Sequence, residues 1–126
     1  MRLGPFFALL AATPTLVACP ANAADDAFTR GKTLSERHCA RCHVVGDYNK
    51  FGGIGSTPSF QLLVNNFPDY KDRFQTFYAR RPHPAFLTIK GFERHMKHLP
   101  PNAQPIEITL PDVADILAFA EGLKKH

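Results

Sequence analysis

The sequence predicts a small all-α domain. Residues 26–38 and 110–124 both have apolar side chains at helical spacing, and the segment between them is rich in Pro and Gly, which leaves room only for short helices. The chain has 126 residues, the size of one small domain. Its hydrophobic content of 44% is typical of a globular protein rather than a disordered one.

The N-terminal segment predicts export. Residues 3–19 carry no charge and are mostly apolar, and a small-x-small site follows at Ala21-Asn22-Ala23, so we expect residues 1–23 to be a secretory signal peptide. Residues 24–126 would then form one mature domain in the bacterial periplasm. Two alternatives stay open: a retained membrane anchor, which would be short for a bilayer span, and a lipobox ending at Cys19, which would tether the protein to a membrane by a lipid.

Residues 26–38 are expected to form the first helix of the domain. Asp26 is a suitable N-cap, and Phe28, Gly31 and Leu34 recur at helical spacing. A glycine inside a helix costs roughly 1 kcal/mol relative to alanine. Gly31 therefore indicates a packing constraint, such as another helix that crosses closely at this point.

This helix leads into Cys39-Ala40-Arg41-Cys42-His43, which has the spacing of a c-type haem attachment site. Two thiols three positions apart on a helical turn are placed to form thioethers with the two haem vinyl groups. His43 follows at once, as the proximal ligand of the iron. Three other interpretations of the cysteines stay open: a redox-active dithiol, a zinc site completed by His95 and His98, and a structural disulfide.

The rest of the chain divides into loops, short helices and a final long helix. Gly and Pro predict a loop over residues 46–58, short helices over 59–67 and 69–81, and mostly loop over 82–108. The final helix, over 110–124, begins with a capping box formed by Thr109 and Asp112, and Pro111 suits its first turn. One face of this helix is apolar and consists of Val113, Ile116, Leu117, Ala120 and Leu123.

These features together resemble a class I cytochrome c. The resemblance covers most of residues 27–124, with a poor match in the middle, and is carried by Phe28-Thr29-Arg30-Gly31-Lys32, Cys39-Ala40-Arg41-Cys42-His43, Thr57-Pro58-Ser59-Phe60 and Asp112-Val113-Ala114-Asp115-Ile116-Leu117-Ala118-Phe119. It implies a cytochrome c-like fold around one covalently bound haem, with the first and last helices crossed and Gly31 against Phe119. It also implies His–Met ligation of the iron, one-electron transfer, and a Pro58 carbonyl that accepts the Nδ1–H of the proximal His43.

The sixth iron ligand has several candidates. Met1 leaves with the signal peptide, so Met96 is the only methionine of the mature chain, and it lies where the resemblance implies the distal ligand. Met96 is not followed directly by Pro, however, which departs from the family. His95 and His98 flank it, and His83 lies upstream between two prolines. Each histidine is an alternative ligand and would lower the redox potential relative to methionine.

The predicted function is that of an electron carrier rather than an enzyme. Its partners would be a redox protein donor and acceptor that bind transiently, and the membrane only if Cys19 is lipidated. The formal net charge of +4 is not the strong imbalance of a nucleic-acid-binding protein. Two alternatives remain: a haem enzyme or ligand sensor with an open sixth position, and a tethered cytochrome subunit of a larger dehydrogenase or oxidase.

Overall fold

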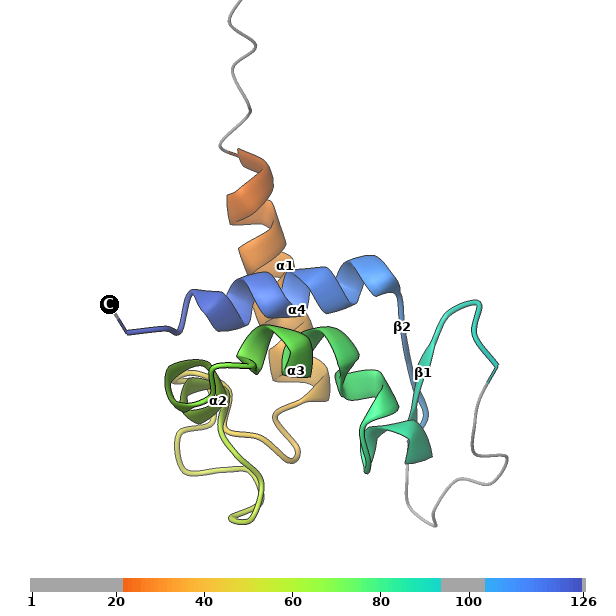
Figure 1. Ribbon diagram of the computed structural model, residues 1–126, viewed down its shortest axis with the longest axis horizontal. Helices are drawn as coiled ribbons and strands as arrows, with labels where there is room; N and C mark the ends of the chain where they lie inside the picture. The colour runs from red at the N-terminus through yellow and green to blue at the C-terminus, as the bar shows by residue number, and fades with distance from the viewer. Residues whose placement is uncertain (1–21, 94–103, 126) are drawn as a thin grey trace, which may run out of the picture.

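The structure is a computed structural model, and it describes residues 22–93 and 104–125 (Figure 1). Helices dominate, as the sequence predicts. In chain order the elements are α1 (Asn22–His38), α2 (Phe60–Asn66), α3 (Tyr70–Thr76), the 3-10 turns η1 (Phe77–Ala79) and η2 (His83–Ala85), the strands β1 (Leu87–Ile89) and β2 (Ile106–Ile108), and α4 (Leu110–Glu121).

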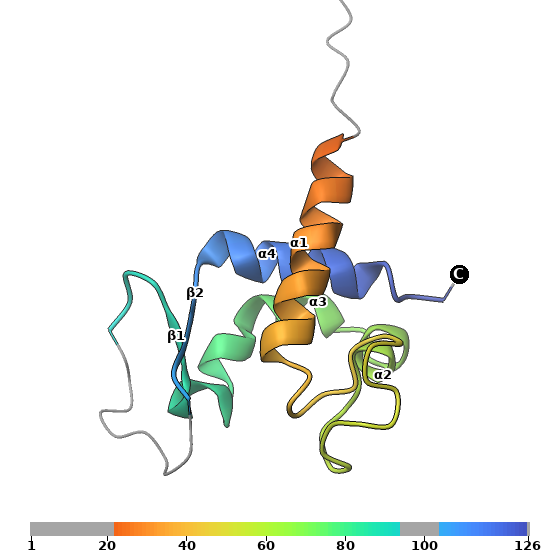
Figure 2. The same ribbon diagram turned by 180° about the vertical axis from the view of Figure 1, so that it is seen from behind.

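Helices α1 and α4 cross steeply, and the remaining elements lie to one side of α4 (Figures 1 and 2). The crossing is close because α1 has small residues there: Gly31 and Ser35, one turn apart, are both buried. A Cβ atom on Gly31 would overlap the backbone carbonyl oxygen of Asp115. Beside this contact the Arg30 guanidinium makes two hydrogen bonds to the Asp115 carboxylate, at 2.7 and 3.0 Å. The predicted crossing at Gly31 is therefore confirmed.

The partner of Gly31 differs from the expected one. Gly31 faces the backbone of Asp115 and Ile116, whereas the ring of Phe119 packs edge-on against Phe28, with ring centres 5.3 Å apart. Gly31 has no side chain, so the backbone of α4 can come into direct contact with the backbone of α1 at this residue. The two helices therefore cross at Asp115, one turn before Phe119. The Phe28–Phe119 pair packs next to this contact, before Gly31 in α1 and after Asp115 in α4.

The helix boundaries follow local chemistry. Helix α1 begins at Asn22, four residues before the expected start, and ends at His38. At α4 the predicted capping box is confirmed: the Asp112 N–H donates to the Thr109 hydroxyl, and the Thr109 N–H donates to the Asp112 carboxylate. Helix α2 begins after Ser59, whose hydroxyl accepts the N–H of Leu62.

The segment predicted to be mostly loop contains a two-stranded parallel ladder. Leu87 pairs with Ile106, and Ile89 pairs with Ile108. Each strand has only three residues. Three residues are too few to show the alternation of apolar and polar side chains by which a strand is predicted from a sequence. The ladder forms because Leu87, Ile89 and Ile108 are buried against the core.

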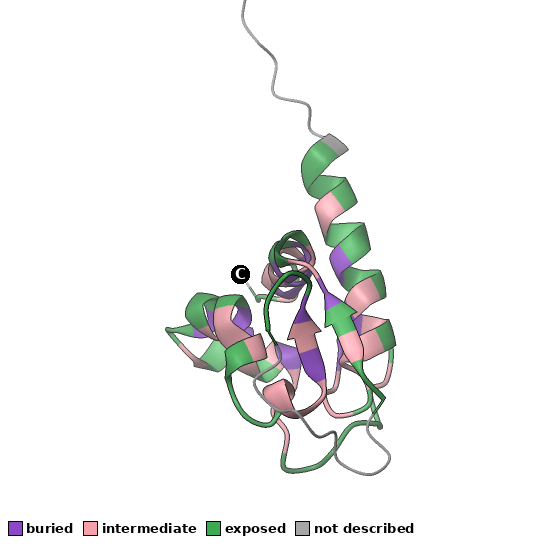
Figure 3. Cartoon of the chain, turned by 90° about the vertical axis from the view of Figure 1, so that its right-hand side faces the viewer, coloured by how far each residue is buried: buried purple, intermediate pink, exposed green. Residues whose placement is uncertain are grey.

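The core lies where α2, α3, the strands and α4 face one another, and the outer surfaces are exposed (Figure 3). Its large buried side chains come from widely separated segments, among them Val45, Phe60, Val64, Phe74, Ile89, Ile108, Ile116 and Phe119. In the two described stretches, no helix combines the length and the apolar character needed to cross a membrane.

Candidate functional site

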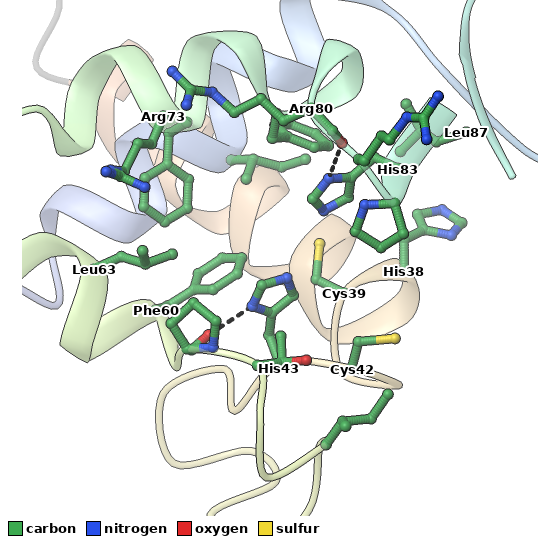
Figure 4. Close-up of a pocket in the computed structure, with 18 of the residues that line it drawn as sticks. His38, Cys39, Cys42, His43, Phe60, Leu63, Arg73, Arg80, His83 and Leu87 are labelled. Carbon is green, nitrogen blue, oxygen red and sulfur yellow. Dashed lines mark hydrogen bonds between the residues drawn. The ribbon is translucent and has the colours of Figure 1, made fainter. Parts of the chain in front are cut away.

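A cavity of about 390 Å³ opens beside the C-terminal end of α1 (Figure 4). Most of its wall is apolar, and the aromatic part of that wall is formed by Phe60, Phe74, Phe77 and Phe86. The polar groups that line it include Cys39, Cys42 and His43 on one side and His83 on another. The cavity thus brings together residues from four separate parts of the sequence.

The Cys39–His43 segment continues the last turn of α1 as a tight turn. The N–H groups of Cys42 and His43 both donate to the Cys39 carbonyl, at 3.1 and 2.9 Å. This turn directs both cysteines toward the cavity as free thiols. Loss of solvent, with a smaller contribution from Cys42, raises the pKa of the Cys39 thiol to about 12, so that thiol is protonated at neutral pH.

The His43 ring is oriented by a backbone carbonyl. Its Nδ1 lies 2.7 Å from the carbonyl oxygen of Pro58, 15 residues farther along the chain. A carbonyl only accepts hydrogen bonds, so Nδ1 carries a proton, and in the neutral form of the ring Nε2 keeps its lone pair. Phe60 packs edge-on against the ring at 5.6 Å and supports this orientation. A neutral imidazole with a free Nε2 is the form that binds a metal ion.

Asn49 supports the turn from behind and was not predicted from the sequence. Its amide group donates to the carbonyls of Ala40 and His43, at 2.9 and 2.8 Å, and its oxygen accepts the N–H of Val45 at 2.7 Å. These bonds hold the start and the end of the motif at one fixed separation. An asparagine in a Gly-rich loop has no sequence signal that distinguishes this role from an ordinary turn.

His83 faces the motif from the other side of the cavity. Its Nδ1 lies 2.9 Å from the Arg80 carbonyl oxygen, within the same turn, and its ring contacts Phe77 and Phe86, with centres 5.3 and 6.2 Å away. Burial lowers the pKa of His83, the bond to Arg80 partly offsets that effect, and the nearby His43 lowers the pKa slightly further. At neutral pH its imidazole is therefore uncharged.

The family model for cytochrome c matches residues 28–124. The chain belongs to the cytochrome c family. Comparisons with curated proteins and with solved structures gave no match. The match begins within α1, runs past the end of α4 and includes every residue that lines the cavity, as the resemblance to class I cytochromes c implied.

Cytochromes c bind haem c, with its iron, covalently, and the cavity fits that cofactor. Two free thiols stand next to an imidazole whose Nε2 is unblocked, and the wall around them is aromatic and aliphatic, as a porphyrin requires. Among the described residues there is no group of three or more His, Cys, Asp or Glu side chains arranged to hold a metal ion without a cofactor.

The structure describes only part of the predicted site. Four of the residues predicted from the sequence lie outside the described residues, namely Met96, His95, His98 and Cys19. The structure does bring Cys39, Cys42, His43 and Pro58 together, and it adds His83 to them.

Proposed function

We propose that this chain is an exported one-electron carrier of the bacterial cell envelope that holds a single haem c. The observation that carries the proposal is the geometry of the motif: Cys39 and Cys42 line one cavity as free thiols, and His43 presents an unblocked Nε2 to the same cavity. When bound, haem c supplies an iron that alternates between the ferric and ferrous states.

Each motif residue has a distinct task in this proposal. Cys39 and Cys42 form the thioethers, which fix the cofactor in a chain with a small core. His43 is the proximal iron ligand. The Pro58 carbonyl, 2.7 Å from Nδ1, holds the ring in its plane and raises the basicity of Nε2. Asn49 keeps the turn that positions all three motif side chains.

The cavity lining favours a carrier over a haem enzyme or a ligand sensor. A second imidazole, His83, lies across the cavity from His43, on the side where an enzyme or sensor would keep an open position. A protein ligand on that side would leave no free site on the iron for a substrate, which suits electron transfer.

The rim of the cavity suits a brief encounter with a redox partner. Ile54 lines the cavity and is half-exposed, and Phe51, on the same loop, is fully exposed. The exposed Arg81 also lines the cavity and has no ion-pair partner among the described residues. Apolar and positively charged side chains at the rim of the cavity suit weak, transient docking of an acidic electron donor or acceptor.

Export rests on the predicted leader, residues 1–23. Cleavage after Ala23 would release the protein into the periplasm, whereas lipidation at Cys19 would tether it to a membrane as a subunit of a larger dehydrogenase or oxidase. Fractionation separates the two. Recovery in the membrane fraction that is lost on Cys19→Ala would favour the tethered form, and recovery in the periplasm would favour the free carrier.

The attachment sites are tested by the pyridine haemochrome spectrum after acid-acetone extraction. The full chain, expressed with a haem-attachment system, should retain one haem per polypeptide with a c-type α band. Cys39→Ala and Cys42→Ala should each shift that band by leaving one vinyl group free, and the double variant should lose the haem. Cys19→Ala, the matched control at the third cysteine, should retain it unchanged. Extraction of all haem from the unmodified chain would refute the proposal.

A further inference from the structure

His83 and His43 face each other across the cavity with their rings almost parallel. The ring centres are 6.1 Å apart and the planes differ by 5°. Figure 4 shows that a nitrogen-bearing edge of each ring points toward the other ring. The pair therefore leaves a position between its two facing edges.

The separation is that of two ligands on one metal ion. An imidazole nitrogen binds a transition metal at about 2 Å, and the ring centre lies about 1 Å farther back, so two rings on opposite sides of one ion have centres about 6 Å apart. The observed 6.1 Å matches this value.

The hydrogen bonds of both rings leave the same atom free. His43 donates from Nδ1 to the Pro58 carbonyl and His83 donates from Nδ1 to the Arg80 carbonyl, at 2.7 and 2.9 Å. In their neutral forms both rings therefore keep a lone pair on Nε2, and both turn that edge into the space between them. Two converging lone pairs in a largely apolar cavity repel each other unless a cation lies between them.

We propose that His83 is the sixth ligand of the haem iron, so that the iron is held between two histidines. This inference rests on the proposed attachment of haem c at Cys39 and Cys42. It replaces Met96, which the resemblance to class I cytochromes c implied, and it selects one among the three histidines that the sequence left open.

The turn around His83 is built to hold a ligand in place. Pro82 and Pro84 flank the residue and restrict its backbone, and the Arg80 carbonyl accepts both the N–H and the Nδ1–H of His83. Phe77 and Phe86 contact the ring. A carbonyl bonded to Nδ1 is the usual support of a metal-bound histidine. These hydrogen bonds and ring contacts restrict the His83 side chain more than is usual for a histidine on the surface.

The ligand set has a chemical consequence. A thioether stabilises ferrous iron and raises the redox potential, whereas a second imidazole lowers it. The protein should therefore pass electrons at a lower potential than the His–Met carriers that it resembles. We therefore expect its electron donor or its electron acceptor to be a redox protein of low potential.

Spectroscopy of the holoprotein tests the proposal directly. The ferric protein should be low-spin and should lack the far-red sulfur-to-iron band of His–Met haem. Its electron paramagnetic resonance spectrum should be the rhombic type, because parallel ligand planes separate the energies of two iron d orbitals that perpendicular planes would leave equal. A sulfur-to-iron band in the unmodified protein would overturn the proposal.

Variants then assign the ligand. His83→Ala should give high-spin ferric haem and bind cyanide faster by roughly tenfold or more, because no internal ligand competes for the iron. His83→Met, which keeps a ligand in place if the alanine variant folds poorly, should gain the sulfur-to-iron band and a higher potential. Met96→Leu, the matched control, should leave spectrum and potential unchanged. His83→Ala that stays low-spin with the original spectrum would assign the position to another side chain and overturn the proposal.

The outcome can be separated from failure of the proposed function. Haem content per chain is measured first, by the haemochrome assay. Absence of covalent haem from the unmodified protein removes the proposed function and this inference together. Covalent haem with an axial sulfur leaves the proposed function intact and overturns the sixth ligand alone.

Discussion

Two segments face each other across the cavity and present the same group by different means. The proximal segment, residues 39–60, holds the His43 ring through the carbonyl of Pro58, 15 residues away. The distal segment, residues 77–89, holds the His83 ring through the carbonyl of Arg80, three residues away in the same turn. One support depends on the tertiary fold, and the other is local.

The proximal and distal segments should therefore differ in how easily they open. Phe60, which supports His43, is only 3% exposed and contacts both Phe74 and Phe119 in the core. Phe77 and Phe86, which support His83, are only partly buried. No residue from 77 to 86 is fully buried, unlike Leu87 and Ile89 that follow, and stretches with few buried contacts open locally at a small cost in free energy. The distal side should therefore open without unfolding of the protein, whereas the proximal side should open only with global unfolding.

The aromatic supports give the largest expected contrast. Phe60→Ala should lower the free energy of unfolding by about 3–5 kcal/mol, as for other buried phenylalanines replaced by alanine. Phe86→Ala should lower it by about 1–2 kcal/mol, because part of that ring already contacts solvent. Guanidinium unfolding of both ferric holoproteins measures the two values. Equal losses would show that the two supports are equally part of the core.

Asn49 offers a smaller effect that is confined to the proximal side. Asn49→Ala removes three hydrogen bonds to backbone groups of the motif turn and should cost about 2–3 kcal/mol of stability. Asn49→Asp tests the two donated bonds alone, since a carboxylate still accepts the Val45 N–H but cannot donate to the Ala40 and His43 carbonyls. Chemical unfolding should rank both variants below the unmodified protein. If neither variant lowers the unfolding midpoint, Asn49 is not what holds the turn.

Two glycines with positive φ compare the loops on the two sides. Gly53, with φ of 78°, packs on the motif, so that an added Cβ would lie 3.0 Å from the Cys42 carbonyl oxygen. Gly91, with φ of 89°, follows the distal segment and has nothing within 4 Å of that position. Both alanine variants carry about 1–2 kcal/mol of backbone strain. Gly53→Ala should be the less stable of the two in thermal unfolding, and the reverse order would contradict the close packing of that loop.

The same contrast explains what the sequence could predict. The motif at Cys39–His43 is visible because thioether attachment fixes its spacing, and the two crossing helices are visible because burial of one face imposes a period on their apolar residues. The ladder of Leu87–Ile89 with Ile106–Ile108 has no such signal, because three residues do not establish an alternation. It forms only because the fold brings two apolar segments together.

Site residues that act through backbone groups were the hardest to predict. The three bonds of Asn49 depend on where the carbonyls of a turn point, and no residue type encodes that direction. His83, the proposed sixth ligand, was one of several candidates of similar chemistry in the sequence. Only the position of η2 relative to the motif distinguishes it, and that position depends on contacts between distant segments.

The smallest predicted effect separates local from global opening most directly. Pro84 lies in the first turn of η2 and restricts the open form of the distal segment, whereas Pro58 lies in the proximal segment. Replacing a proline by alanine releases about 0.4–1 kcal/mol of conformational entropy in the open chain. In Pro84→Ala that free energy should raise the population in which His83 is off the iron, and cyanide should bind ferric haem about two- to fivefold faster.

Pro58→Ala is the matched variant on the other side of the cavity. It keeps the carbonyl that accepts the His43 proton, and the proximal segment is tied to the core by Phe60 and Asn49. Its cyanide-binding rate should therefore equal that of the unmodified protein, while its unfolding midpoint falls slightly. Equal acceleration in both variants would mean that ligand entry follows global unfolding, and the distal segment would then not be an independently opening unit.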